Sequence, residues 1–168
     1  MDLTPPLPSG EWHHLGGFLD HLRNTVESQA LGLGEEDLFL TVGTVSIGGI
    51  LTHLAFIEDY WFGYVWAGLD LPEPWPSAPW DEEPDADWGM ARRLGGRGAL
   101  ALWRDAVART QAVIAPCPLD GVSARDTADG PVSRRWIVLH MLEEYARHAG
   151  QADLLRRMVG EAPRQATA

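Results

Sequence analysis

The residues best suited to hold a metal lie in the segment RRWIVLHMLEEYARHAGQADLLRRM, near the C-terminal end of the chain. Glu144 and His148 are four residues apart, and this spacing places both side chains on one face of a helix, about one turn apart. His140 lies one turn earlier on the same face. A carboxylate and an imidazole among apolar neighbours must be paired or must bind a metal. Two ligands from one helix and a third from elsewhere would form an open metal site of the catalytic kind.

The third ligand is expected to be His53, in the segment IGGILTHLAFIEDYWFGYVWAG. Apolar residues recur in this segment at the spacing of an amphipathic helix; they are Ile47, Ile50, Leu51, Leu54, Ile57, Trp61 and Val65. A histidine on the apolar side of a helix is, taken alone, more often a hydrogen-bonded core residue than a ligand. Its occurrence together with Glu144 and His148 favours a metal site, in which His140 would be a further ligand or the partner of one.

The elements that must position these residues are helices. Apolar periodicity and breaker residues predict helices over about 11–30, 46–67, 97–115 and 133–159, with Ser133 as a cap of the last one. No segment shows the alternation typical of a strand. The chain is therefore expected to be all-α, a four-helix bundle, and the core of such a bundle is a common place for metal ligands from facing helices. The length of 168 residues predicts a single domain, with a core of about 11–160.

Residues 68–92, between the second and third predicted helices, form a long segment rich in proline and tryptophan. The segment contains Trp75, Trp80 and Trp88, and tryptophan side chains favour order because they bury large areas. We therefore predict a folded crossover loop that covers one end of the bundle. Its acidic residues, from Asp81 to Asp87, could bind a cation but fit a solvated loop better.

Composition excludes several classes of function. All 13 basic residues are arginine, so no Schiff-base lysine and no P-loop lysine exists. The net charge of −11 argues against a nucleic-acid partner.

No apolar run is long enough to span a membrane, and the N-terminus lacks the features of a signal peptide, so a cytoplasmic protein is expected. The lone Cys117 offers no convincing nucleophile. The abundance of Ala, Gly, Arg and Pro is typical of a GC-rich, actinobacterial genome.

The order of these features resembles the DinB-like superfamily, and in particular its mycothiol-dependent branch, which includes mycothiol-dependent maleylpyruvate isomerase. The resemblance rests on a histidine in an early helix followed by WF, an acidic Trp-rich loop, and the block LHMLEEYARHAGQADLLRR. It covers about residues 11–158. Many members carry His-x-x-x-His where this chain has Glu144 and His148, and the Glu version is similar to the isomerase, whose metal is held by two His and one Glu. Carried over by position, the ligands would be His53, Glu144 and His148, with His140 in a supporting role.

The resemblance implies a metal-dependent thiol transferase or isomerase. Two imidazoles and a carboxylate suit a divalent metal, zinc first, with nickel, iron or manganese as alternatives. The metal would hold the thiolate of mycothiol, the small-molecule thiol, for attack on a small-molecule electrophile. A metal-dependent hydrolase and a non-catalytic metal-binding bundle are the alternatives. A homodimer is expected because relatives often form one and because exposed aromatic side chains in 68–92 would make an apolar patch.

Overall fold

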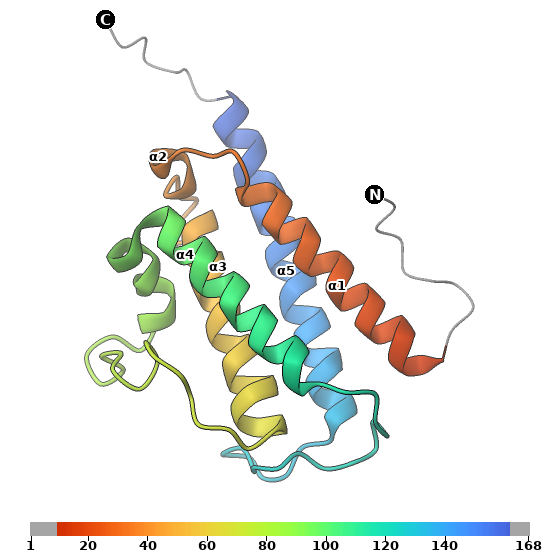
Figure 1. The fold of residues 1–168 in the computed structure, drawn as a ribbon. Coiled ribbons are helices and arrows are strands. Elements are labelled where there is room, and N and C mark those ends of the chain that lie inside the picture. The colour runs from red at the N-terminus through yellow and green to blue at the C-terminus, as the bar shows by residue number, and fades with distance from the viewer. Residues whose placement is uncertain (1–9, 162–168) are drawn as a thin grey trace, which may run out of the picture.

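The computed structural model describes residues 10–161 of the chain, and this part is helical. Figure 1 shows its long segments running side by side, with α3 against α4 and α1 against α5. The elements are α1 (Glu11–Ala30), α2 (Glu35–Leu38), α3 (Ile47–Ile57), the π-helix η1 (Glu58–Trp66), α4 (Ala86–Val113) and α5 (Arg134–Glu161). No strand occurs among these residues, so the all-α prediction is confirmed. None of these helices is both long and apolar enough to cross a membrane.

The predicted apolar stripe of the second helix is buried almost throughout, and Ile47, Ile50 and Leu51 are inaccessible to solvent. Ser46 begins this helix, because its Oγ accepts a hydrogen bond from the backbone N–H of Gly49. Ser133 caps α5 in the same way, accepting from the backbone N–H of Trp136. The helix itself changes geometry at Glu58, where α3 continues into η1 with the wider hydrogen-bonding pattern of a π-helix. Apolar spacing alone predicted a single regular helix here.

The third helix begins much earlier than predicted. α4 starts at Ala86 and kinks at Gly95, whose φ of 71° lies in the left-handed region. The backbone N–H of Gly96 then donates to the carboxylate of Glu35 in α2, which satisfies a donor that the kink would leave unpaired. Residues 86–92 were therefore wrongly assigned to the loop, and the short helix α2 was not predicted. Asp87, assigned to a solvated loop, is instead a buried residue of α4.

The loop that remains, between η1 and α4, is tied to the core through its first tryptophan. Trp75 is fully buried, and its Nε1–H donates to Oδ2 of Asp59 at 2.8 Å. Trp80 is half-buried and donates to the backbone carbonyl of Trp75 at 2.9 Å. Trp88 is also half-buried. The expectation that these aromatic side chains form an exposed patch is therefore wrong.

A network of buried polar side chains joins α1, η1, α4 and α5. Glu58 is fully buried, and both of its carboxylate oxygens accept hydrogen bonds from the guanidinium of Arg23 in α1 at 2.8 Å. The Tyr145 hydroxyl of α5 also donates to Glu58, at 2.6 Å, and accepts from Nε1–H of Trp103 in α4. The network thus pairs every charge that it buries, as a low-dielectric interior requires.

Candidate metal centre

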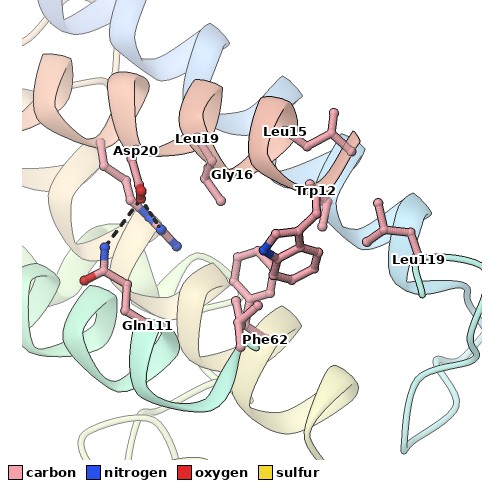
Figure 2. Close-up of a pocket in the computed structure, with 11 residues that line it drawn as sticks. Trp12, Leu15, Gly16, Leu19, Asp20, Phe62, Gln111 and Leu119 are labelled. Carbon is pink, nitrogen blue, oxygen red and sulfur yellow. Dashed lines mark hydrogen bonds and ion pairs between the residues drawn. The ribbon is translucent and has the colours of Figure 1, made fainter. Parts of the chain in front are cut away.

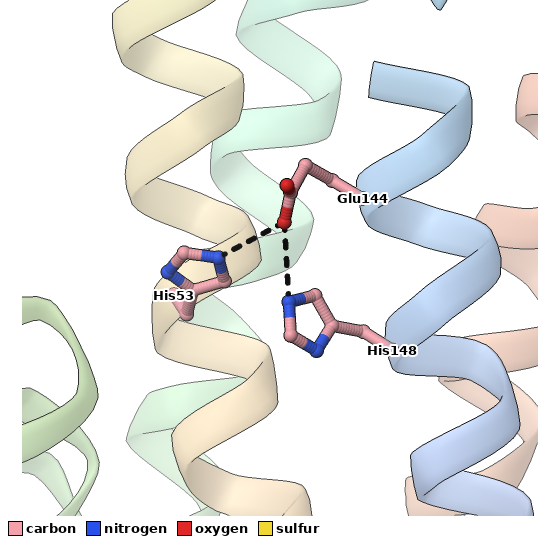
Figure 3. A group of neighbouring side chains, drawn as sticks. All are labelled: His53, Glu144 and His148. Atoms are coloured by element: carbon pink, nitrogen blue, oxygen red, sulfur yellow. Dashed lines mark ion pairs between the residues drawn. The ribbon is translucent and has the colours of Figure 1, made fainter. Parts of the chain in front are cut away.

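His53 of α3 and the Glu144 and His148 pair of α5 meet between the two helices (Figure 3). Oε2 of Glu144 lies 3.6 Å from Nε2 of His53 and 3.3 Å from Nε2 of His148. One potential ligand atom from each residue lies within 4.8 Å of the others. Atoms bound to a single tetrahedral zinc at about 2.0–2.1 Å are roughly 3.4 Å apart. The two distances to Glu144 match this spacing, and the 4.8 Å limit for the whole group means that the imidazoles would move slightly closer together to share one ion.

Each imidazole is oriented by a partner on its other ring nitrogen. Nδ1 of His53 lies 2.6 Å from Oδ2 of Asp87, and Nδ1 of His148 lies 2.7 Å from Oε1 of Gln151. Because both partners present an oxygen, each Nδ1–H donates to its partner, and each Nε2 faces Glu144, where a neutral ring would offer its lone pair to a metal. Histidines that bind metals are commonly held this way. The sequence-based reading missed both partners, although Gln151 lies three residues after His148 and its helical spacing could have revealed it.

The charges around the centre favour the forms that bind metal. Burial raises the pKa of Glu144, but the positive charge of Arg147, 2.9 Å away, and smaller contributions from the histidines outweigh it, so the pKa of Glu144 lies below its ordinary value. Burial lowers the pKa of His148 below its ordinary value, against the hydrogen bond with Gln151. An ionised carboxylate and a neutral imidazole are the states that a metal ligand needs.

The centre is narrow but open to solvent. The side chains of His53, Glu144 and His148 are 17%, 12% and 6% exposed. Trp88 forms one side, with its indole stacked on the His53 ring at 4.6 Å and edge-on to the His148 ring at 5.4 Å. The three side chains are thus mostly buried, and an aromatic side chain covers them on one side.

His140 lies outside this group of three. Its ring stacks on Trp136, with 4.8 Å between centroids, and meets Trp61 edge-on at 4.9 Å. The structure thus places His140 against two tryptophans on the side of the centre that faces the N-terminal end of α5. Its predicted role as a supporting residue or alternative ligand stays a prediction.

A separate cavity of ≈ 180 Å³ lies beside α1, and neither the candidate ligands nor their partners line it (Figure 2). Its lining includes Trp12, Leu15 and Phe62, together with Arg23. The guanidinium of Arg23 already donates to Asp20 and Glu58. Asp20 also lines the cavity, and the guanidinium of Arg23 is shared between its half-exposed carboxylate and that of Glu58, so the cavity offers no free positive charge to a ligand.

Comparison with known protein families gives one finding that covers most of the chain. The family model described as Mycothiol-S-transferase matches residues 14–160. The matched range includes every residue of the candidate centre and both of the partners that orient its imidazoles. None of the curated proteins matches the chain.

Proposed function

The chain belongs to the Mycothiol-S-transferase family, and we propose that it acts as a metal-dependent transferase that joins the sulfur of mycothiol to an electrophilic small molecule. The observation that carries this proposal is the convergence of two oriented imidazoles and an ionised carboxylate on one point. His53, Glu144 and His148 would be the three ligands. Two nitrogen donors and one oxygen donor suit zinc, and nickel, iron or manganese are alternatives.

A divalent metal, when bound, lowers the pKa of a coordinating thiol so that the thiol binds as its thiolate. The residues of the chain do the rest. Asp87 and Gln151 keep the proton of each imidazole on Nδ1, so that both Nε2 atoms stay available as ligands. Arg147 keeps Glu144 ionised through its charge. Trp88 shields one side of the site from water. The sulfur would then form a bond to the electrophilic carbon while the bond from that carbon to its leaving group breaks. The leaving group departs with the electron pair of that bond, as chloride does from a chloroarene, and the proton lost by the thiol passes to solvent.

Cobalt substitution tests this proposal directly. Cobalt in a site with these three ligands should give a thiolate-to-cobalt absorption band that grows and saturates as mycothiol is added. The S-methyl derivative of mycothiol, which cannot ionise at sulfur, should give no such band. If the protein binds cobalt but no thiol changes the absorption spectrum, the transferase mechanism is wrong. Metal-dependent hydrolysis is then the better explanation of the site.

The ligand assignment is tested by comparing Glu144→Ala with His140→Ala. Loss of Glu144 removes one bond and one negative charge, so zinc affinity should fall by more than the roughly 10–100-fold typical of residues that only support a ligand. His140→Ala should cause the smaller loss. Competition with a chelating dye measures both affinities. If His140→Ala lowers zinc affinity more than Glu144→Ala does, the ligand on α5 lies one helical turn from the assigned position.

A further inference from the structure

A cleft of ≈ 450 Å³ lies at the junction of η1, the start of α5 and the loop before it. Trp61 and Tyr60 of η1 form one wall, Trp136 of α5 forms another, and loop residues 127–133 form the rim. The volume is within the range of sites that bind small molecules. None of the candidate metal ligands lines this cleft.

The rim of the cleft is held in place by backbone hydrogen bonds. Ala124 and Arg125 donate to the carbonyls of Trp66 and Val65 at the end of η1, at 3.1 and 3.0 Å. Thr127 and Gly130 exchange backbone hydrogen bonds at 2.9 and 3.0 Å, which closes the tip of the loop. The cleft is therefore formed before any ligand arrives, and binding there does not require the loop to be ordered first.

The cleft and the metal centre lie along the same pair of helices. Trp61 follows His53 by eight residues along α3 and η1, and Trp136 precedes Glu144 by eight residues along α5. At the rise of an α-helix, eight residues correspond to roughly 12 Å. His140 lies between the two places and contacts both tryptophans. A single extended molecule could thus reach from the cleft to the metal ligands.

The lining of the cleft suits a ring that carries hydroxyl groups. The C–H face of a sugar ring packs on an indole, whose face is electron-rich, and the Trp136 side chain is 47% exposed here. Hydroxyl groups at the edge of such a ring need acceptors. The carboxylate of Asp129 is exposed at the rim and has no ion-pair partner within residues 10–161.

We propose that this cleft binds the carbohydrate part of the thiol cosubstrate, an amino sugar linked to inositol, while the cysteine sulfur extends past His140 toward His53, Glu144 and His148. Trp61 and Trp136 would pack on a ring, and Asp129 would accept hydrogen bonds from hydroxyl groups. This inference rests on the proposed function, because only a thiol joined to a carbohydrate needs both places at once. It assigns specificity for the thiol to residues outside the metal centre.

The test uses the glucosaminyl-inositol fragment of mycothiol, which has no sulfur, and calorimetry on the protein with its metal removed. The fragment should bind the unaltered protein. Trp136→Ala should weaken its binding by about 3–10-fold, the range of an aromatic contact, and Asp129→Asn should weaken it as well. Two matched controls should leave binding unchanged: Phe18→Ala, whose side chain is 52% exposed on α1, and Asp126→Asn, an exposed acid of the same loop outside the lining.

Two outcomes would overturn the inference. One is failure of the fragment to bind the unaltered protein at millimolar concentration, and the other is binding that neither variant weakens. If both variants instead weaken binding of an aromatic electrophile such as 1-chloro-2,4-dinitrobenzene and not that of the fragment, the cleft belongs to the second substrate. The cobalt spectrum separates these results from a failure of the proposed function, since N-acetylcysteine lacks the carbohydrate and should still produce the thiolate band.

Discussion

Asp87 and Gln151 decide which nitrogen each histidine of the centre presents. The 2.6 Å contact between Asp87 and Nδ1 of His53 also places a negative charge behind the ring. Such a charge makes the imidazole a stronger donor to a metal. Neither residue is among the candidate ligands, but both fix the orientation of the two candidate imidazoles.

We expect Asp87→Ala to lower zinc affinity by about 10–100-fold without changing the number of bound ions, because His53 loses its orienting acceptor. Asp85→Ala is the control. Asp85 precedes the same helix and is exposed, and its side chain makes no capping hydrogen bond. Chelator competition measures both affinities. Equal affinities for Asp87→Ala and the unaltered protein would contradict the orienting role.

The metal-free protein should lose stability as the pH falls below about 6.5, the ordinary pKa of histidine. Burial holds the pKa of His148 below that value in the folded state, so the unfolded chain binds the proton more readily. The stabilisation is fully present above the unfolded pKa and is lost as the pH falls through the folded pKa. Glu144, whose pKa is also lowered, adds a further loss at more acid pH.

Urea unfolding in the presence of EDTA, measured between about pH 8 and pH 5, checks this expectation. His148→Gln should reduce the change of the free energy of unfolding with pH in that interval, because glutamine does not titrate. An unchanged slope in His148→Gln would show that another group is responsible.

At the scale of elements, the approach of α3 to α4 positions one side of the centre. A Cβ atom built on Gly49 would lie 3.0 Å from a ring carbon of Trp88, and Trp88 stacks on His53. Because Gly49 has no side chain, the Trp88 indole of α4 can lie against α3 and stack on the His53 ring.

Gly49→Ala should displace Trp88, lower zinc affinity and reduce the free energy of unfolding by about 1–3 kcal/mol, the usual cost of overpacking. Gly63→Ala in η1 is the matched control, because nothing lies within 4 Å of its added Cβ. Alanine there should be neutral or stabilising by about 0.5–1 kcal/mol. Chemical denaturation measures the free energy of unfolding of both variants, and chelator competition measures their zinc affinity. Equal losses of stability and affinity in Gly49→Ala and Gly63→Ala would contradict the steric explanation.

At the scale of the whole molecule, the network around Glu58 joins α1, η1, α4 and α5. Glu58→Ala should lower the free energy of unfolding by about 3–5 kcal/mol, because it leaves the buried guanidinium of Arg23 without its main partner. Glu27→Ala removes the partner of Arg104 from a partly exposed pair, with side chains 27% and 49% exposed, and should cost only about 0–1 kcal/mol. Urea titrations followed by tryptophan fluorescence compare the two. If both variants lose a similarly small free energy of unfolding, the buried pair of Arg23 and Glu58 contributes little to stability.

The homodimer stays a prediction, and the patch in 68–92 that supported it is absent. Exposed apolar side chains lie instead on α5, where Leu154 is 64% exposed. If a dimer forms through this helix, Leu154→Glu should dissociate it, whereas Leu94→Glu on α4 should not. Light scattering at high concentration measures the mass, and a monomer under all conditions would contradict the prediction.

The sequence alone determined the features that depend on local geometry. Helical spacing put Glu144 and His148 on one face, and apolar periodicity placed His53 inside the α3 helix with its neighbours buried. These features follow from the 3.6-residue turn, whatever the rest of the chain does. The occurrence of His53 together with that pair favoured one shared site, and the family resemblance then supported the match between the two helices, which spacing within either helix cannot give.

Only the tertiary structure decided which distant residues meet. Asp87 lies 34 residues from His53 along the chain, in a segment whose helix was hidden by the glycines at 95 and 96. The kink is stable because Glu35 of α2 accepts from the N–H of Gly96, and no local pattern reveals that contact. Trp61 and Trp136 likewise form one cleft with the loop only because η1 and α5 pack together. Helix periodicity fixes which side of an element is buried, but packing fixes what it is buried against.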